Sequence, residues 1–214
     1  MEVKKISPRV SCFLQVKLDQ AVVDYLWKII DIGKTNNKNH KNKLVGNISQ
    51  SLLLDDIDSF FYKSVCVPLI KYYRENNPIS GDPVSENTLL KPGSKLILNN
   101  LWVNYQYKTE FNPSHDHSGV YSFAIWMKIP YSWEDQKKLP QFRNIRDGDI
   151  KAGCFEFEYI DSLGGILNSM YRLSSEYEGY MVFFPARLRH CVYPFYGSDE
   201  PRISVAGNLN YLPD

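Results

Sequence analysis

The chain has 214 residues, 43% of them hydrophobic and 23% charged, which is the composition of a soluble globular protein. Its 25 basic and 24 acidic residues leave a formal net charge of +1, so composition gives no sign of a nucleic-acid or membrane partner. No apolar run approaches the roughly 20 residues needed to span a bilayer, and the N-terminus carries no apolar signal core. We therefore expect a cytoplasmic protein of one domain, whose four scattered cysteines are reduced.

The N-terminal part begins with one short strand and a helix. A run rich in β-formers at 9–17 predicts the strand. Behind Asp19, a suitable N-cap, apolar residues recur at helical spacing up to Gly33, where the helix is expected to stop. Residues 34–49 are rich in Lys and Asn and lack apolar periodicity. They predict an exposed loop with His40 at the surface.

The pattern changes from helical to strand-like near the middle of the chain. A longer helical pattern covers 50–76, and Pro68 is expected to kink or divide that helix. Residues 77–93, rich in Pro and Gly, predict a loop. The β-runs that follow predict a sandwich or barrel of about seven or eight strands, with the polar insertion 130–149 as a long loop beside its mouth. The predicted strands are 96–107, 120–129, 154–160, 167–173, 180–184, 191–193 and 202–211.

Two of the four histidines, His115 and His117, are separated by one residue. In an extended segment, residues i and i+2 project to the same face, so both imidazoles can point at one position. Neutral imidazole binds iron, zinc and copper. The distant His190 is the candidate third ligand. The competing interpretation is an exposed histidine pair and a structural His190 in the core.

Three segments of the C-terminal part follow one another in a specific order. The first is H-D-H-S-G-V-Y from His115, the second is F-P-A-R-L-R-H-C-V-Y-P around His190, and the third is R-I-S-V-A-G-N from Arg202. Together they resemble the 2-oxoglutarate- and Fe(II)-dependent oxygenase superfamily, and within it the oxygenases found in marine bacteria and their phages. The resemblance covers roughly residues 95–212.

This resemblance implies a mainly β protein with a double-stranded β-helix core, the jelly-roll or cupin-like arrangement. Residues 95–214 would form the oxygenase core, and residues 1–94 the strand and helices that buttress it. The implied cofactors are Fe(II) and 2-oxoglutarate, with O₂ as oxidant. The implied reaction is hydroxylation of a peptide or prolyl residue, or of a small molecule, with release of succinate and CO₂.

The resemblance assigns the metal to His115, His117 and His190. Most members of the superfamily have a carboxylate where His117 stands, so Asp116 is the alternative second ligand. Adjacent strand residues point to opposite faces, which favours His117 over Asp116. Three neutral ligands would leave the iron complex more positive than a ligand set with a carboxylate.

The far carboxylate of 2-oxoglutarate would be held by Arg202 and Ser204. The planar fork of an arginine matches a carboxylate with two hydrogen bonds. Tyr121 and Asn104 are further candidates to point into the barrel and bind the keto acid.

Other interpretations remain open at this point. Arg187 and Arg189 flank the site, either as solvated charges or as partners of an anionic substrate. The protein could also be a non-catalytic β-barrel that binds or assembles, or a metal enzyme that uses no 2-oxoglutarate. Arg202 distinguishes them, because it has a carboxylate partner only in the first interpretation.

Overall fold

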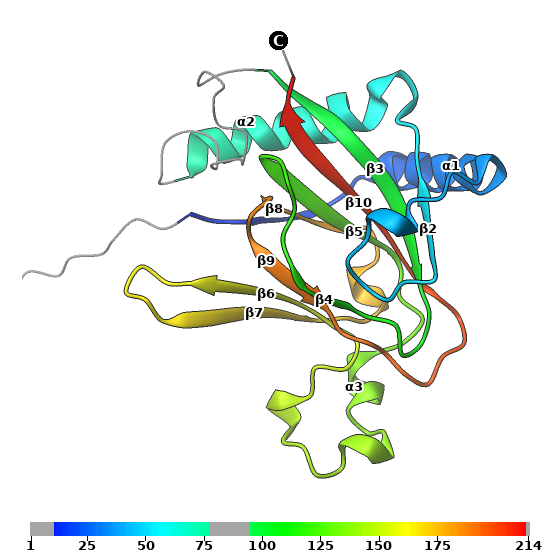
Figure 1. Ribbon diagram of the computed structural model, residues 1–214, viewed down its shortest axis with the longest axis vertical. Helices are drawn as coiled ribbons and strands as arrows, with labels where there is room; N and C mark the ends of the chain where they lie inside the picture. Colours follow the sequence, from blue (N-terminus) through cyan, green and yellow to red (C-terminus); the bar gives the residue numbers. More distant parts are fainter. Residues whose placement is uncertain (1–10, 78–94, 213–214) are drawn as a thin grey trace, which may run out of the picture.

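The computed structural model describes residues 11–77 and 95–212. Nearly all of the predicted loop 77–93, and the first residues of the predicted strand 9–17, lie outside this part of the chain. The described strands form two antiparallel sheets (Figure 1).

The larger sheet has six strands in the order β1-β8-β5-β10-β3-β2. Its two longest strands, β3 and β10, lie next to each other, and β5 pairs with the other side of β10. The N-terminal part supplies both edge strands, because β1 pairs with β8 and β2 pairs with β3. The bounds are β1 Leu14–Lys17, β2 Gln50–Leu53, β3 Leu96–Gln106, β5 Tyr121–Lys128, β8 Tyr180–Pro185 and β10 Arg202–Tyr211.

The smaller sheet has four strands in the order β4-β9-β6-β7. Its strands β6 and β7 form a long hairpin that Figure 1 shows extending away from the body of the molecule. The bounds are β4 Asn112–His115, β6 Cys154–Ile160, β7 Ile166–Arg172 and β9 Arg189–Val192. The short strand β4 contains His115, in the segment that was expected to be extended although no strand bounds were predicted for it.

Two helices cover one side of the larger sheet, as Figure 1 shows. Helix α1 (Gln20–Asn36) buries one apolar face in the core. It continues one turn beyond Gly33 and ends at Asn37, whose left-handed backbone lets its N–H donate to Gly33 O. The core between helices and sheet also includes residues of α2 (Val67–Asn76).

The prediction of a helix starting at residue 50 was wrong. Residues 50–53 form β2, whose backbone pairs with β3, so this tertiary pairing outweighs the local helical pattern. The helical part begins later, with a 3₁₀ turn at Ile57–Ser59, and continues through a π-helical turn at Tyr62–Cys66 into α2. Pro68 stands in the first turn of α2, where its missing N–H is tolerated, and it marks the expected division.

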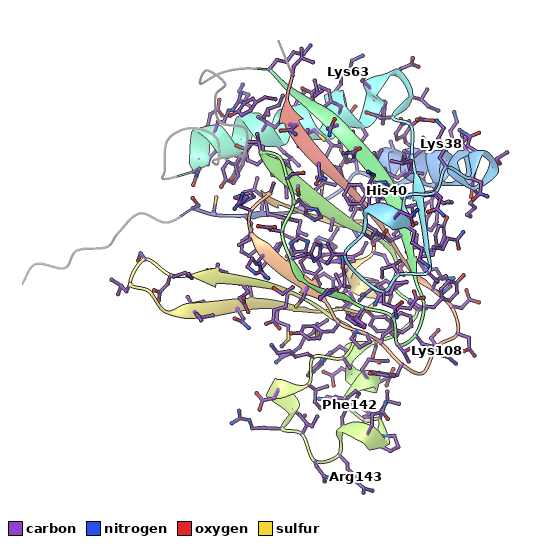
Figure 2. All side chains as sticks on the ribbon, viewed as in Figure 1. Lys38, His40, Lys63, Lys108, Phe142 and Arg143 are labelled. Carbon is purple, nitrogen blue, oxygen red and sulfur yellow. The ribbon has the colours of Figure 1, made fainter. Side chains whose placement is uncertain are left out.

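The insertion 130–149 contains the short helix α3 (Trp133–Gln136) and two 3₁₀ turns at Pro140–Phe142 and Asp147–Asp149. Phe142 and Arg143 mark its tip, at the end of the molecule opposite the two long helices (Figure 2).

Among the described residues, no helix has the length and apolar character needed to cross a membrane. All four cysteines are free thiols. The remaining 3₁₀ turns are Lys41–Lys43 and Ser175–Tyr177.

Candidate functional site

Three histidines meet where β4 and β9 pair. His115 lies directly opposite His190 in the register of these strands, and His117 follows two residues later. One ring nitrogen from each histidine lies within 4.8 Å of those of the other two. His117 Nε2 and His190 Nε2 are 3.2 Å apart. The three imidazoles can therefore coordinate one metal ion.

The backbone fixes the orientation of two of these rings. His115 Nδ1 lies 2.7 Å from Pro113 O, and His190 Nδ1 lies 3.0 Å from Leu188 O. A carbonyl oxygen only accepts, so each Nδ1 carries the proton and each Nε2 keeps its lone pair. Hydrogen bonds of this kind orient histidine ligands in metal sites. These two rings are prepared to bind a metal through Nε2.

Gly119 allows the chain to turn from the histidine pair into β5. Its φ angle is 118°, a conformation that side chains strongly disfavour, and a Cβ atom there would lie 2.8 Å from Leu209 O. His117 N–H donates to Ala186 O at 2.8 Å, which ties the segment to the chain that precedes β9. The glycine of the S-G-V-Y sequence is therefore required by the turn that follows the histidine pair.

All three histidines are held neutral by their surroundings. Burial lowers the pKa of His117 to about 3, with a contribution from His115. Burial also lowers the pKa of His115, and burial with the two neighbouring histidines lowers that of His190 well below its usual value. Phe155 stacks on the His190 ring at 5.5 Å between centroids. Neutral imidazole is the form that binds a metal.

The histidines open into a cavity of about 560 Å³ between the two sheets. Strand alternation brings every second residue in parts of β3 and β10 to this cavity. In β10 these residues are Arg202, Ser204, Ala206 and Asn208. Ser204 lies opposite Asn104 of β3 and Trp126 of β5, and all three line the cavity.

Arg202 is a buried cation, 2% exposed, at one end of this cavity. Its guanidinium donates to Gln106 Oε1 and to the Tyr131 hydroxyl, and at 3.4 Å to the carbonyl oxygens of Gly153 and Tyr193. Burial raises the pKa of Tyr131 to about 12, so this hydroxyl is neutral. No carboxylate of the described residues pairs with Arg202. A buried arginine without an acidic partner suits the binding of an anion.

Of the other predicted site residues, all but Tyr121 line the cavity. Asn104 and Ser204 line the cavity, and Asn104 Oδ1 has no hydrogen-bond partner among the described residues. Asp116 is exposed, lies 3.6 Å from Arg187 Nε and stands outside the three-histidine cluster. Tyr121 does not line the cavity.

Tyr121 packs in the core on the helix side of the larger sheet, stacked on Phe183 at 4.9 Å. The prediction that it points into the barrel does not match this position. The residues of β5 that line the cavity are Phe123, Ala124 and Trp126, and Ser122 donates to Asn208 Oδ1 at 2.8 Å.

His40 is buried, which corrects its placement at the surface. It belongs to residues 38–47, which we call the strap, and its side chain is 8% exposed. Figure 2 shows His40 within the body of the molecule, whereas Lys38 lies nearer its edge. His40 and Trp102 line the cavity with ring centroids 5.0 Å apart. The lysine and asparagine neighbours of His40 gave no signal of this burial.

The sequence matches the profile of one protein family over residues 100–208, which is half of the chain. That family is described as "Putative 2OG-Fe(II) oxygenase". The chain belongs to this family. It is a 2-oxoglutarate- and Fe(II)-dependent oxygenase, with O₂ as co-substrate. A comparison with curated proteins finds no match.

Solved structures of such oxygenases share the fold. A prolyl-4-hydroxylase from Pseudomonas putida has a TM-score of 0.53 at 11% identity, with 94% of each chain covered. A viral collagen prolyl hydroxylase from Paramecium Bursaria Chlorella virus-1 has a TM-score of 0.51 at 10% identity, with 94% of this chain and 96% of that chain covered. The epimerase SnoN from nogalamycin biosynthesis, which depends on alpha-ketoglutarate, has a TM-score of 0.53 at 14% identity, with 95% and 79% covered. These likenesses confirm the double-stranded β-helix fold expected from the sequence.

Proposed function

We propose that this oxygenase hydroxylates a C–H bond of a peptide, such as a prolyl residue, or of a small molecule, and converts 2-oxoglutarate and O₂ into succinate and CO₂. One observation carries the proposal. A cluster of three neutral imidazoles and a buried arginine without an acidic partner line the same cavity. One group suits a metal and the other suits the far carboxylate of a keto acid.

In this proposal His115, His117 and His190 hold Fe(II). When bound, the iron supplies the redox chemistry that activates O₂. The three histidines orient the metal, and the carbonyl oxygens of Pro113 and Leu188 keep the rings of His115 and His190 in place. Aromatic side chains around His190 exclude water from that side of the site.

Arg202 would bind the far carboxylate of 2-oxoglutarate, with Ser204 and Asn104 beside the carbon chain of the keto acid. Gln106 Oε1 and the Tyr131 hydroxyl hold the guanidinium in position while leaving it positively charged. Rigid placement of this kind orders the reactants before any bond changes. The prolyl hydroxylases among the similar structures support a peptide or prolyl substrate as one candidate.

The test is the binding of 2-oxoglutarate to the zinc-loaded protein, measured by calorimetry. Arg202→Ala should weaken binding by on the order of 2–3 kcal/mol, because one charge-assisted contact is lost. Arg202→Lys keeps the charge but loses the fork and should be intermediate. Arg189→Ala is the matched control, since Arg189 is exposed and donates to Ser114 O.

Circular dichroism establishes that each variant is folded. If folded Arg202→Ala bound 2-oxoglutarate as tightly as the unchanged protein, the keto-acid site would lie elsewhere. If the unchanged protein bound none, the chain would be a metal-binding barrel that does not use the keto acid.

A further inference from the structure

The strap forms one wall of the cavity and is fixed at both ends. Near its start, Leu53 N–H donates to Lys38 O at 2.8 Å, which joins it to the larger sheet. Near its end, Phe111 N–H donates to Asn47 O at 3.2 Å, just before β4. The strap therefore connects the two sheets and presents its side chains to the cavity between them.

His40 of the strap and Trp102 of β3 form an aromatic pair close to the histidine cluster. Their ring centroids are 5.0 Å apart, and the Trp102 ring is 6.0 Å from that of His117. Burial, with the nearby charge of Lys43, lowers the pKa of His40, so the imidazole is neutral. The two rings are tilted by 31° and form an aromatic wall beside the histidine cluster.

The indole N–H of Trp102 is a buried donor without a partner. Trp102 is 3% exposed, lines the cavity, and its Nε1 makes no hydrogen bond to any described residue. A buried donor without a partner is unfavourable, so such a group at a binding cavity points to a ligand acceptor. Trp102 thus carries a donor that no described residue satisfies, on a side chain that lines the cavity.

This donor lies away from Arg202 along β3, on a ring whose centroid is 6.0 Å from that of His117. Arg202 is level with Gln106 in the β10–β3 register, whereas Trp102 is level with Ala206. The four residues from Trp102 to Gln106 span roughly 13 Å of strand. A keto acid that reaches from the metal to Arg202 leaves the Trp102 side to the molecule that is oxidised.

A positive charge on the strap lines the same part of the cavity. The charged residues that line the cavity in the described chain are Lys43, Asp116 and Arg202. Asp116 pairs with Arg187, and Arg202 lies at the far end. Lys43 makes no ion pair with any described residue. The charge that remains for a substrate is therefore positive.

We propose that Trp102, His40 and Lys43 form the subsite for the substrate that is oxidised, and that this substrate carries a carboxylate. The inference rests on the proposed function, since it takes the Arg202 end as the keto-acid site. The indole N–H donates to a carboxylate oxygen, Lys43 supplies the opposite charge, and the neighbouring His40 ring packs against the indole. Acidic peptides and small carboxylic acids share this chemistry.

The test uses protein labelled with 5-fluorotryptophan and saturated with zinc and 2-oxoglutarate, so that the Arg202 end is filled. The protein has four tryptophans, and Trp102→Phe assigns the Trp102 fluorine resonance. The small probes are benzoate and N-acetylglutamate, and the peptide probe is Gly-Ser-Glu-Glu-Ser-Gly. Each of these three acids is compared with a neutral control compound, in which amides replace its carboxylates.

We expect at least one acid, and none of the amides, to shift the Trp102 resonance in a saturable way. A response to the peptide alone identifies an acidic side chain as the source, and a response to the small acids alone identifies a metabolite. Lys43→Gln should weaken that binding about fivefold. Lys41→Gln, on the same turn but outside the cavity lining, should change it less than twofold.

The subsite is overturned if no acid shifts the Trp102 resonance, if amides act as well as acids, or if Lys43→Gln and Lys41→Gln behave alike. Calorimetry on the same samples reports 2-oxoglutarate binding separately. Keto-acid binding without any probe response would reject the subsite alone. Loss of keto-acid binding would reject the proposed function, and the Trp102 resonance would still report on the acids.

Discussion

His117 Nε2 lies 3.2 Å from His190 Nε2, with His190 buried and His117 half-buried. His190 donates its Nδ1 proton to Leu188 O, so its Nε2 is the acceptor, and His117 Nε2–H is the donor without a metal. The two nitrogens that would bind the metal therefore bind each other in its absence. A proton and a metal compete for this position.

Acid should destabilise the metal-free protein through these histidines. The folded-state pKa of His117, about 3, is below the ordinary value of 6.5, so the unfolded chain binds a proton that the folded protein does not. Stability is then complete above the unfolded value and is lost as the pH falls below it. Between about pH 7.5 and pH 5.0, His117 alone should remove about 2 kcal/mol.

Urea unfolding of chelator-treated protein at the two pH values measures this loss. His117→Asn, which cannot titrate, should reduce the pH dependence by about the same 2 kcal/mol. An equal pH dependence in both proteins would mean that His117 is accessible to protons in the folded state.

Gly46 allows the strap to approach β4. A Cβ atom there would lie 2.3 Å from Asn112 Oδ1 and 2.7 Å from Phe111 O. Gly46→Ala should therefore push the strap away and lower the free energy of unfolding by about 1–3 kcal/mol. Gly148→Ala is the control, because a Cβ at Gly148 meets nothing within 4 Å, and it should change stability by less than about 0.5 kcal/mol.

Chemical denaturation of both glycine variants measures their free energies of unfolding. A Gly46→Ala protein as stable as Gly148→Ala would show that the strap can move without cost. The strap would then be a weaker support for His40 than its backbone contacts indicate.

Helix α1 should contribute a large part of the stability of the larger sheet. Leu26 is fully buried in the core between helix and sheet. Leu26→Ala should cost about 2–5 kcal/mol, because it removes apolar contacts and leaves a cavity. Ile32→Ala on the same helix, at a side chain 37% exposed, should cost well under half as much. Equal losses in thermal or urea unfolding would contradict this packing.

Much of the fold followed from local patterns in the sequence. The apolar spacing of α1 and the alternation in β10 depend on neighbours within one element, which a sequence displays directly. Residues 50–53 did not follow their pattern, because β2 is fixed by pairing with β3. Such a pairing between distant segments leaves no period in the chain.

Part of the site could also be predicted from the sequence, because it depends on local spacing. The spacing of His115 and His117 places both imidazoles at one point, and the motif around His190 supplies the third. His40 and Tyr131 reach the site from loops, and loop paths carry no periodic signal. Tyr121 was misplaced because both faces of β5 are largely apolar, so the face that meets the cavity depends on the register with β10.

The most direct measurement adds Fe(II) and then 2-oxoglutarate to the protein without oxygen and records the weak visible charge-transfer band of the chelate. The account predicts a band that is lost in His117→Ala and kept in Asp116→Ala, because His117 belongs to the cluster and Asp116 is exposed beside Arg187. Metal content is measured in parallel. A band lost with Asp116→Ala but kept with His117→Ala, or no band in iron-loaded protein, would contradict the three-histidine oxygenase site.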